Sequence, residues 1–473
     1  MCLRARPIVA AAVVVAAAGV GSQTPNAPAQ SDRDLMARAR AIHDRVITLD
    51  THNDIEPSNF TPSCNYAMRL TTQVNLPKMK EGGLDVSFMI VYVEQPNPAQ
   101  VRDAFQPSGY ERAYRAALAK FDAVHLLTEI IAPREIELAL TPADVARIAK
   151  SGKKVAVIGV ENGYPIGTDI RRVKEFWDRG GRYMSLAHNG HSQLADSNTG
   201  EANNQWSWGG LSSLGRQVVE EMNKWGIMVD VSHLSKGATL QAIGLSKAPV
   251  IASHSSVRRL ANVSRNMDDE MLLAMKTNGG VVQVVALSGF VKADPPERAP
   301  AIRALNQEFG LTAPAGGRGA ASTVASAQAG RGRCPVDHPS LVFQAVGPGL
   351  GPTAAANLGN LTLAQRADYE RRITDIDKKW PAAGRASVKD FVDHIDYAVK
   401  LAGIDHVGIA SDFDGGGGID GWNSAAETFN VTLALVRRGY NEEQIGKIWS
   451  GNLLRVWSEV ENVAKQIQQG QTR

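Results

Sequence analysis

Cysteine is scarce in this sequence: there are three residues in 473, at positions 2, 64 and 334. So few thiols exclude a scaffold built on disulfides and a zinc site with cysteine ligands. Cys2 lies in a segment that we interpret below as a leader peptide, which leaves Cys64 and Cys334. These two can form one disulfide in an oxidising compartment or stay unpaired, and the sequence leaves both alternatives open.

A large excess of either charge is also absent. The formal net charge is +3 at pH 7, and no run of basic residues stands out. Proteins that bind nucleic acid carry a strongly basic patch, so no nucleic-acid partner is expected. Hydrophobic residues make up 44% of the chain and charged residues 21%, which is typical of a globular protein with a large core.

A hydrophobic run long enough for a confident membrane span is missing as well. An apolar stretch at about residues 8–20 follows Arg4 and Arg6, and the small residues "APA" end at Ala29. This layout is that of a secretory signal peptide, and the stretch is shorter than a membrane span of ~20 residues. We therefore expect residues 1–29 to be a signal peptide and the mature chain to be periplasmic or extracellular, without a stable membrane span. An uncleaved anchor is the alternative.

The sequence does contain eight apolar, β-rich runs with amphipathic segments between them. The runs cover residues 46–54, 84–93, 154–163, 182–190, 227–235, 249–256, 280–289 and 406–415. Most are continuously apolar, as in parallel strands that are buried on both faces. Eight alternating strand–helix units predict an α/β fold, a (β/α)8 TIM-type barrel that forms one domain over residues 30–473. A doubly wound sheet is the alternative.

The gap between the seventh and eighth runs is much longer than the others. Within it, residues 313–357 are rich in Gly, Ala, Ser and Pro, a composition that cannot bury enough apolar surface to fold alone. We predict a flexible insertion loop there, between strands 7 and 8, which is either a lid over the active-site face or an insertion without a role. Near the C-terminus, Asn441 followed by Gln444 predicts the start of a helix.

The first run ends in polar residues, "TLDTHND" (48–54). Residues two apart point to the same side of a strand, so His52 and Asp54 project together from its end. Both are metal ligands, although a polar turn also explains a single pair of this kind. Ionisable side chains recur at the ends of five further runs: Glu161, His188, His233, His254 and Asp412. A barrel would bring all these ends to one rim.

This set of side chains suits two zinc ions. His52 and Asp54 would hold one ion, while His233 and His254 would hold the other. Glu161 would offer one carboxylate oxygen to each ion. Two metals held in this way lie ~3.5–4 Å apart, and they supply a hydroxide nucleophile and a Lewis acid at neutral pH. Any one of these histidines could be an ordinary histidine buried in the core, but that explanation does not account for several on one rim.

The motifs, in their order, resemble those of the membrane dipeptidase (renal dipeptidase) family, peptidase family M19, which are zinc peptidases of the amidohydrolase superfamily. The matching stretches run from about residue 46 to 462 and include "DTHND", "GVENG", "LAHNGHSQLADS", "VSRNMDDE", "VGIASDFDG" and "GNLLRVWSEVE". The resemblance implies a (β/α)8 barrel with two Zn²⁺ per chain, bridged by Glu161. The ligands that it implies are His52, Asp54, Glu161, His233 and His254. It also implies a dipeptide substrate and tolerance of a D-residue at the second position, and it leaves a homodimer open.

Three further roles follow from the resemblance. His188 would contact the substrate and help to stabilise the oxyanion, Arg265 would bind the substrate carboxylate, and Asp412 would act as acid and base. The catalytic set would then be Asp412, His188 and Glu161. Asp414 is expected to be a structural turn residue.

The sequence departs from the family pattern in two places. "ENGYPIG" (161–167) lacks the Gly-Gly-His-rich version expected after the glutamate, so the pocket wall is expected to differ there. The C-terminal "QIQQGQTR" lacks the hydrophobic tail that some members use for a lipid anchor, so the mature protein is expected to be soluble.

Three other functions remain as alternatives. The first is another amidohydrolase-type zinc hydrolase, acting on acyl amino acids, lactones, β-lactams or phosphoesters; several of these bridge their metals with a carboxylated lysine on strand four, where this chain has His188. The second is an exported zinc-binding protein without activity, which would need neither Asp412 nor Arg265. The third is a phosphate-binding loop at "DGGGG" (414–418), but no Lys-Ser/Thr follows it.

Overall fold

The computed structural model describes residues 31–311, 334 and 361–471. The predicted signal peptide (1–29) lies outside the described residues. So does the predicted insertion loop (313–357), with the exception of Cys334.

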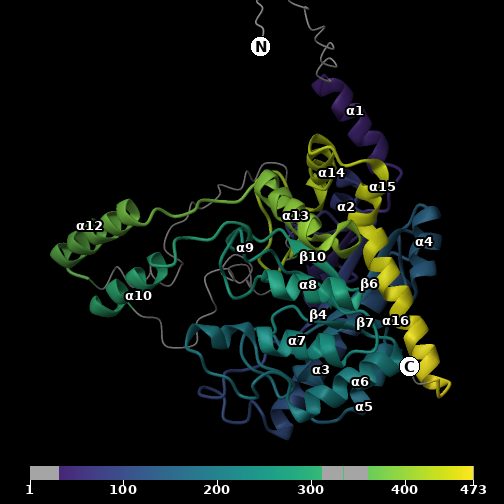
Figure 1. The fold of residues 1–473 in the computed structure, drawn as a ribbon, viewed down its shortest axis with the longest axis horizontal. Coiled ribbons are helices and arrows are strands. Elements are labelled where there is room, and N and C mark those ends of the chain that lie inside the picture. Colours follow the sequence, from purple (N-terminus) through teal and green to yellow (C-terminus); the bar gives the residue numbers. More distant parts are fainter. Residues whose placement is uncertain (1–30, 312–333, 335–360, 472–473) are drawn as a thin grey trace, which may run out of the picture.

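Eight parallel strands form the centre of the molecule (Figure 1). They are β1 (Leu49–Asp54), β4 (Val86–Tyr92), β6 (Lys154–Glu161), β7 (Gly181–Ser185), β8 (Met228–Asp230), β9 (Ile251–Ala252), β10 (Val281–Val285) and β11 (Val407–Ala410). Each coincides with one predicted run, although β7 begins one residue before its run, and the strands pair in chain order. The first and last strands meet through a bridge between Asn53 and Phe413. The sheet is therefore a nearly closed barrel, which confirms the predicted (β/α)8 fold and excludes the doubly wound sheet.

Three short strands were not predicted. β5 (Ile136–Leu138) pairs with β6 outside the barrel order, and β2 (Phe60–Thr61) and β3 (Cys64–Asn65) form a small antiparallel hairpin after β1. None of these three strands lies in one of the eight apolar runs from which the barrel strands were predicted. The barrel strands are also shorter than the predicted runs, and for most of them the polar residues at the end of the run belong to the connecting loop.

Helices surround the sheet (Figure 1). They are α1 (Asp32–His43), α2 (Leu76–Gly82), α3 (Pro107–His125), α4 (Pro142–Lys150), α5 (Arg171–Asp178), α6 (Ser213–Trp225), α7 (Lys236–Leu245), α8 (Asp269–Asn278), α9 (Ser288–Val291), α10 (Arg298–Glu308), α12 (Leu363–Lys379), α13 (Val388–Ala402), α14 (Phe429–Arg437), α15 (Glu442–Gly446) and α16 (Asn452–Gln468). Their ends follow local sequence signals. α6 stops at Gly226, whose φ of +84° suits glycine, and α15 begins with the predicted capping box of Asn441 and Gln444.

The C-terminal helix covers one end of the barrel. Leu49, Val86 and Met228, each the first residue of its strand, share a buried cluster with Val456 and Trp457 of α16. The N-terminal ends of the strands are therefore closed by packed apolar side chains. The opposite end, where the strands terminate, is left for the polar side chains that follow them.

A pair of helices extends away from the barrel (Figure 1). α10 and α12 pack on each other around Leu305, Leu311 and Tyr369, and they flank the insertion segment. A disulfide between Cys64 and Cys334 joins that segment to the β2–β3 hairpin. Of the two alternatives for these cysteines, the structure therefore shows the disulfide. Within the described part of the chain, no helix combines the length and the hydropathy that a membrane span requires.

Candidate metal centre and active site

β1 and β6 bring the first three predicted ligands together. His52 and Asp54 lie on the same side of β1, with 3.8 Å between His52 Nε2 and Asp54 Oδ2. Glu161 is the last residue of β6, and its Oε2 lies 3.5 Å from His52 Nε2. His52 is fully buried, yet its Nε2 atom has no hydrogen-bond partner among the described residues. The three ligand atoms are close enough to share one cation.

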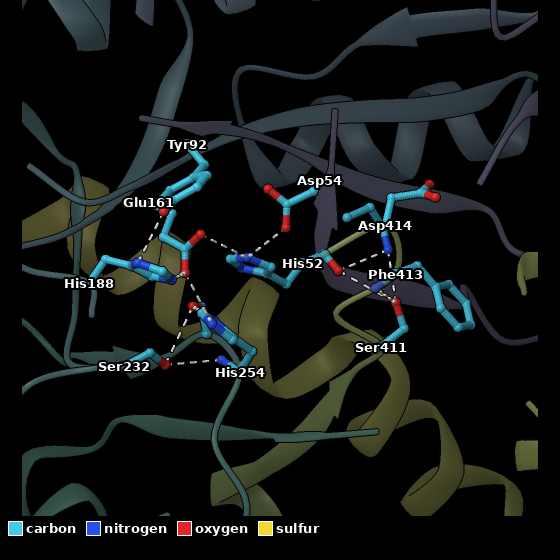
Figure 2. Close-up of polar contacts among 12 residues, drawn as sticks. His52, Asp54, Tyr92, Glu161, His188, Ser232, His254, Ser411, Phe413 and Asp414 are labelled. Carbon is cyan, nitrogen blue, oxygen red and sulfur yellow. Dashed lines mark hydrogen bonds and ion pairs between the residues drawn. The ribbon is translucent and has the colours of Figure 1, made fainter. Parts of the chain in front are cut away.

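His233 and His254 approach the other oxygen of the same carboxylate. Their Nε2 atoms lie 2.9 Å and 3.3 Å from Glu161 Oε1 and 3.0 Å from each other. His233 has a φ of +68°, which non-glycine residues rarely adopt and which is common at functional sites. Figure 2 shows Glu161 between His188 and His52, with His254 below the carboxylate. The structure thus brings the five predicted ligands together, with one oxygen of Glu161 facing each group.

His188 joins the site from the loop after β7. Its Nε2 lies 3.7 Å from Glu161 Oε1, and its Nδ1 lies 3.2 Å from the hydroxyl of Tyr92 (Figure 2). Tyr92 is the last residue of β4 and is the register partner of Glu161 across the sheet. Tyr92 was not predicted as a site residue, because a tyrosine at the end of an apolar run cannot be told apart from any other strand-forming residue.

Asp412 lies beside Asp54, next to a glycine that makes room for both. Asp412 follows β11 with a φ of +59° and is buried. A Cβ atom on Gly415 would lie 2.2 Å from Asp54 Oδ2 and 2.4 Å from Asp412 Oδ1. The glycines of "DGGGG" therefore let the chain pass close to two carboxylates. A phosphate would be repelled by those carboxylates, which argues against the phosphate-binding alternative.

Arg265 brings a buried positive charge to the site. Its Nη1 donates to Ser255 Oγ at 2.7 Å, and its guanidinium lies 5.5 Å from the centre of the Phe290 ring. Nε and Nη2 are buried and have no hydrogen-bond partner in the described part of the chain. Burial lowers the pKa of Arg265 to about 10, so the group remains charged at neutral pH. A buried guanidinium with two unused donor atoms is suited to bind an anion.

The carboxylates of the site create an excess of negative charge. Burial raises the pKa of Asp412 to about 8, and the neighbouring Asp54 and Glu161 add to that shift. Burial also raises the pKa of Asp54 to about 6. For His52, burial favours the neutral form, but the Glu161 carboxylate outweighs it and raises the pKa to about 9. Such a site takes up protons unless cations are bound in their place.

The residues fit divalent cations. Three groups of side chains have ligand atoms close enough to hold one ion: His52, Asp54 and Glu161; Glu161, His233 and His254; and His52, His254 and Asp412. The first two are the predicted groups. The third, which includes Asp412, was not predicted. Imidazole and carboxylate donors without thiolates are typical of catalytic zinc sites.

Two buried aspartates hold the strand ends that carry these ligands. Asp50 accepts from the backbone N–H of His52 at 3.2 Å and of Ser411 at 2.9 Å, which ties β1 to β11. Asp230 accepts from the backbone N–H of Ser253 at 2.9 Å and from its hydroxyl at 2.6 Å, which ties β8 to the segment after β9. The sequence analysis assigned neither residue a role, because an aspartate inside an apolar run gives no sign of its partner strand.

Two other polar residues near the site have structural contacts. Asp414 accepts from the backbone N–H groups of Gln73 and Val74, at 2.8 Å and 3.2 Å, as a turn residue would. His191 Nδ1 accepts from the backbone N–H of Ser197 at 3.1 Å. Neither side chain is part of a group that could hold a metal among the residues described.

The sequence profile of the membrane dipeptidases, described as "Membrane dipeptidase (Peptidase family M19)", matches residues 36–471. The chain belongs to the membrane dipeptidase family. Relatives include the dipeptidase tcpJ of Claviceps purpurea, 27% identical over 84% of this chain and 71% of that protein. The dipeptidase aclJ of Aspergillus oryzae is 27% identical over 89% of this chain and 80% of its own length.

Solved structures agree with this assignment. The probable dipeptidase PvdM from Pseudomonas aeruginosa is 29% identical with a TM-score of 0.71, over 92% of this chain and 100% of that one. A metallo peptidase from Rhodobacter sphaeroides, 21% identical with a TM-score of 0.58 over 88% of this chain and 99% of that one, shares the barrel fold. The family, the fold and the predicted enzyme class, a peptide-bond hydrolase, are confirmed. This M19 chain also carries groups of side chains that could bind metal, as expected of a metallopeptidase.

Proposed function

We propose that this M19 protein is an exported binuclear zinc dipeptidase that hydrolyses the peptide bond of dipeptides, including those with a D-residue at the C-terminal position. The observation that carries the proposal is the convergence of four imidazole Nε2 atoms on the two oxygens of Glu161. A structural core would not gather four histidines around one buried carboxylate, because their mutual repulsion and desolvation are unfavourable.

His52 and Asp54 would hold one zinc ion, His233 and His254 the other, and Glu161 both. When bound, two zinc ions would activate water as the nucleophile and polarise the scissile carbonyl group. Asp412, in reach of His52 and His254, is either a further ligand or the group that handles the proton. We assign it the second role on the family resemblance, because a buried carboxyl beside the proposed metal ligands is placed to take up and return a proton during turnover.

Arg265 selects the substrate. Its two unused buried donor atoms would pair with the C-terminal carboxylate of a dipeptide in a planar, bidentate contact. A carboxylate fixed near the metal centre leaves room for one residue beyond the scissile bond, which favours dipeptides over longer peptides. His188 Nε2, which faces Glu161, is placed to donate a hydrogen bond to the carbonyl oxygen as negative charge develops there.

Export and the acceptance of a D-residue are supported by separate observations. Export rests on the predicted signal peptide, and the Cys64–Cys334 disulfide supports it because such bonds persist in oxidising compartments. Acceptance of a D-residue rests on the family resemblance. The Rhodobacter sphaeroides metallo peptidase, a structural neighbour, is liganded with a phosphinate mimic of the dipeptide L-Ala-D-Ala.

The test is a substrate panel with purified protein lacking residues 1–29. Dipeptides with L and D second residues, an N-acyl amino acid, a lactone and a β-lactam would each be assayed before and after chelator treatment, with zinc added back. We expect dipeptide hydrolysis that is lost with the metal and restored by zinc, and close to two zinc ions per chain by elemental analysis. Preference for the lactone or the acyl amino acid would favour the other amidohydrolase-type function. Zinc binding without hydrolysis of any substrate would favour a binding protein.

A further inference from the structure

The four site histidines differ in what their second ring nitrogen contacts. All four direct Nε2 towards Glu161, at distances of 2.9 to 3.7 Å. Three Nδ1 atoms meet a hydroxyl group: His52 meets Tyr183 at 2.9 Å, His254 meets Ser253 at 2.8 Å, and His188 meets Tyr92 at 3.2 Å. His233 Nδ1 has no partner among the described residues. A hydroxyl can donate or accept, so the direction of each bond depends on its other partners.

The direction is fixed at His52. The hydroxyl of Tyr183 has one hydrogen to donate, and it forms a hydrogen bond to the carbonyl oxygen of Thr51 at 3.0 Å. Its oxygen therefore accepts from His52 Nδ1–H. A neutral imidazole carries one proton, so Nε2 is left with a lone pair directed at Asp54 and Glu161, as a metal ligand requires.

The same direction holds at His254. Ser253 Oγ lies 2.6 Å from Asp230 Oδ2, and a carboxylate can only accept. The serine oxygen is then the acceptor for His254 Nδ1–H, and Nε2 again carries the lone pair. In both cases the hydroxyl donates a hydrogen bond to a buried acceptor and accepts one from the imidazole N–H.

The function assigned to His188 requires the opposite direction. To stabilise an oxyanion, His188 must present an N–H at Nε2, so Nδ1 is the acceptor and the Tyr92 hydroxyl is the donor. Both tyrosines come from barrel strands: Tyr92 ends β4 and Tyr183 lies in β7. Gly159 of β6 leaves space for the Tyr183 ring, because a Cβ atom at position 159 would lie 2.3 Å from Tyr183 Cζ.

We propose that Tyr183 and Tyr92 are positioning residues that set opposite tautomers on two site histidines. Tyr183 keeps the proton of His52 on Nδ1 and leaves Nε2 free for a metal. Tyr92 keeps the proton of His188 on Nε2, where it faces the substrate. This inference deepens the proposed function and rests on it.

The experiment compares Tyr183→Phe and Tyr92→Phe with Tyr440→Phe as the control, since Tyr440 loses one half-buried hydrogen bond to Asp396 elsewhere in the fold. Zinc affinity is measured by competition with a chromophoric chelator, and kcat and KM are measured on one dipeptide. Loss of an outer partner of a metal ligand lowers metal affinity about 10–100-fold, so we expect this for Tyr183→Phe. Tyr92→Phe should bind zinc like wild type within about two-fold and lose about 10-fold or more in kcat, because one preorganised donor is lost.

A second measurement needs no variant. Long-range ¹⁵N–¹H spectra of zinc-loaded protein with labelled histidine report which nitrogen of each ring carries the proton, and histidine-to-glutamine variants assign the signals. We expect the proton of His52 on Nδ1 and that of His188 on Nε2.

Three outcomes would overturn the inference. They are wild-type zinc affinity in Tyr183→Phe, an equal loss of zinc affinity in both variants, and a His188 signal with the proton on Nδ1 or on both nitrogens. Absence of zinc binding and of dipeptide hydrolysis in the wild type would instead overturn the proposed function itself.

Discussion

Asp412 is the residue whose role the geometry constrains least. It adopts a left-handed conformation, with a φ of +59°, immediately after β11. Its side chain can reach a cation together with His52 and His254, yet the same position beside the proposed ligands also suits proton transfer. The two roles differ in a measurable way, because a ligand holds the metal in the resting protein whereas a proton carrier acts only during turnover.

Asp412→Asn should therefore keep both zinc ions and lose turnover. An asparagine has a similar shape but cannot take up or release the proton, and loss of a general acid–base group lowers rates about 10²–10⁴-fold. Zinc content by elemental analysis and kcat on a dipeptide check this, with Asp420→Asn, exposed on the same segment, as the control. Full activity would remove Asp412 from the mechanism. Loss of zinc would identify it as a ligand.

Arg265→Met should weaken the binding of substrates with a free C-terminal carboxylate. Methionine fills part of the buried space but cannot form a charge-assisted bidentate contact, and loss of such a contact, worth about 1.5–3 kcal/mol, raises KM about 10–100-fold. The check is KM for a dipeptide and for its C-terminal amide, with the exposed Arg259→Met as the control. An equal effect on the acid and the amide would show that Arg265 does not bind the carboxylate.

At the scale of elements, the site lies at the carboxyl ends of the strands and on the loops that follow them. The hydrophobic pattern predicted all eight barrel strands, since continuous apolar runs are a strong signal. It also indicated the five candidate ligands that the fold brings together, because a histidine or an acid stands out at the end of such a run. The contributions of Tyr92, Tyr183 and Asp230 could not be predicted. Each depends on a partner from another segment that the folded barrel brings close. No pattern within a single segment of the sequence indicates that partner.

The glycine-rich loop after β11 is one of the loops that form the site, and Gly415→Ala tests whether it shapes the metal centre. The backbone of Gly415 does not require a positive φ, so the added Cβ acts by displacing the Asp54 and Asp412 carboxylates, 2.2 Å and 2.4 Å away. We expect zinc affinity to fall about 10–100-fold, as for other changes around metal ligands. Chelator competition measures this. Gly244→Ala, with open space around its Cβ, is the control. Unchanged zinc affinity in Gly415→Ala would show that the loop does not shape the site.

At the scale of the whole molecule, the fold encloses more ionisable groups than it can keep charged without cations. The barrel is closed at one end by α16 and tied between its strand ends by Asp50 and Asp230. The opposite end holds the carboxylates and histidines of the candidate metal centre, which come from several strands and from the loops that follow them. Stability and metal binding should therefore be coupled, since each cation relieves the repulsion among groups that the packing holds together.

This coupling predicts how the stability of metal-free protein depends on pH. Burial raises the pKa of Asp412 to about 8 and that of Asp414 to about 7, from 3.8, whereas for His52 the carboxylates overcome burial and raise it to about 9 from 6.5. Between pH 6.5 and 9 the folded chain then binds more protons than the unfolded chain, so its free energy of unfolding should increase as the pH falls. From about pH 7.5 downwards, His188, His233 and His254 increasingly oppose this trend, because burial lowers their pKa values in the folded chain while the same histidines take up protons in the unfolded chain.

Urea unfolding of chelator-treated protein at several pH values between 6.5 and 9 measures the effect, with zinc-loaded protein as the comparison. We expect the metal-free protein to gain stability towards pH 6.5 and the zinc-loaded protein to change much less, because bound cations replace the protons. Metal-free Asp412→Asn should show a weaker dependence than metal-free wild type, since one of the three titrating groups is gone. A metal-free protein that loses stability on acidification within this window would contradict the coupling, because the carboxylates would then be charged in the fold without any cation to balance them.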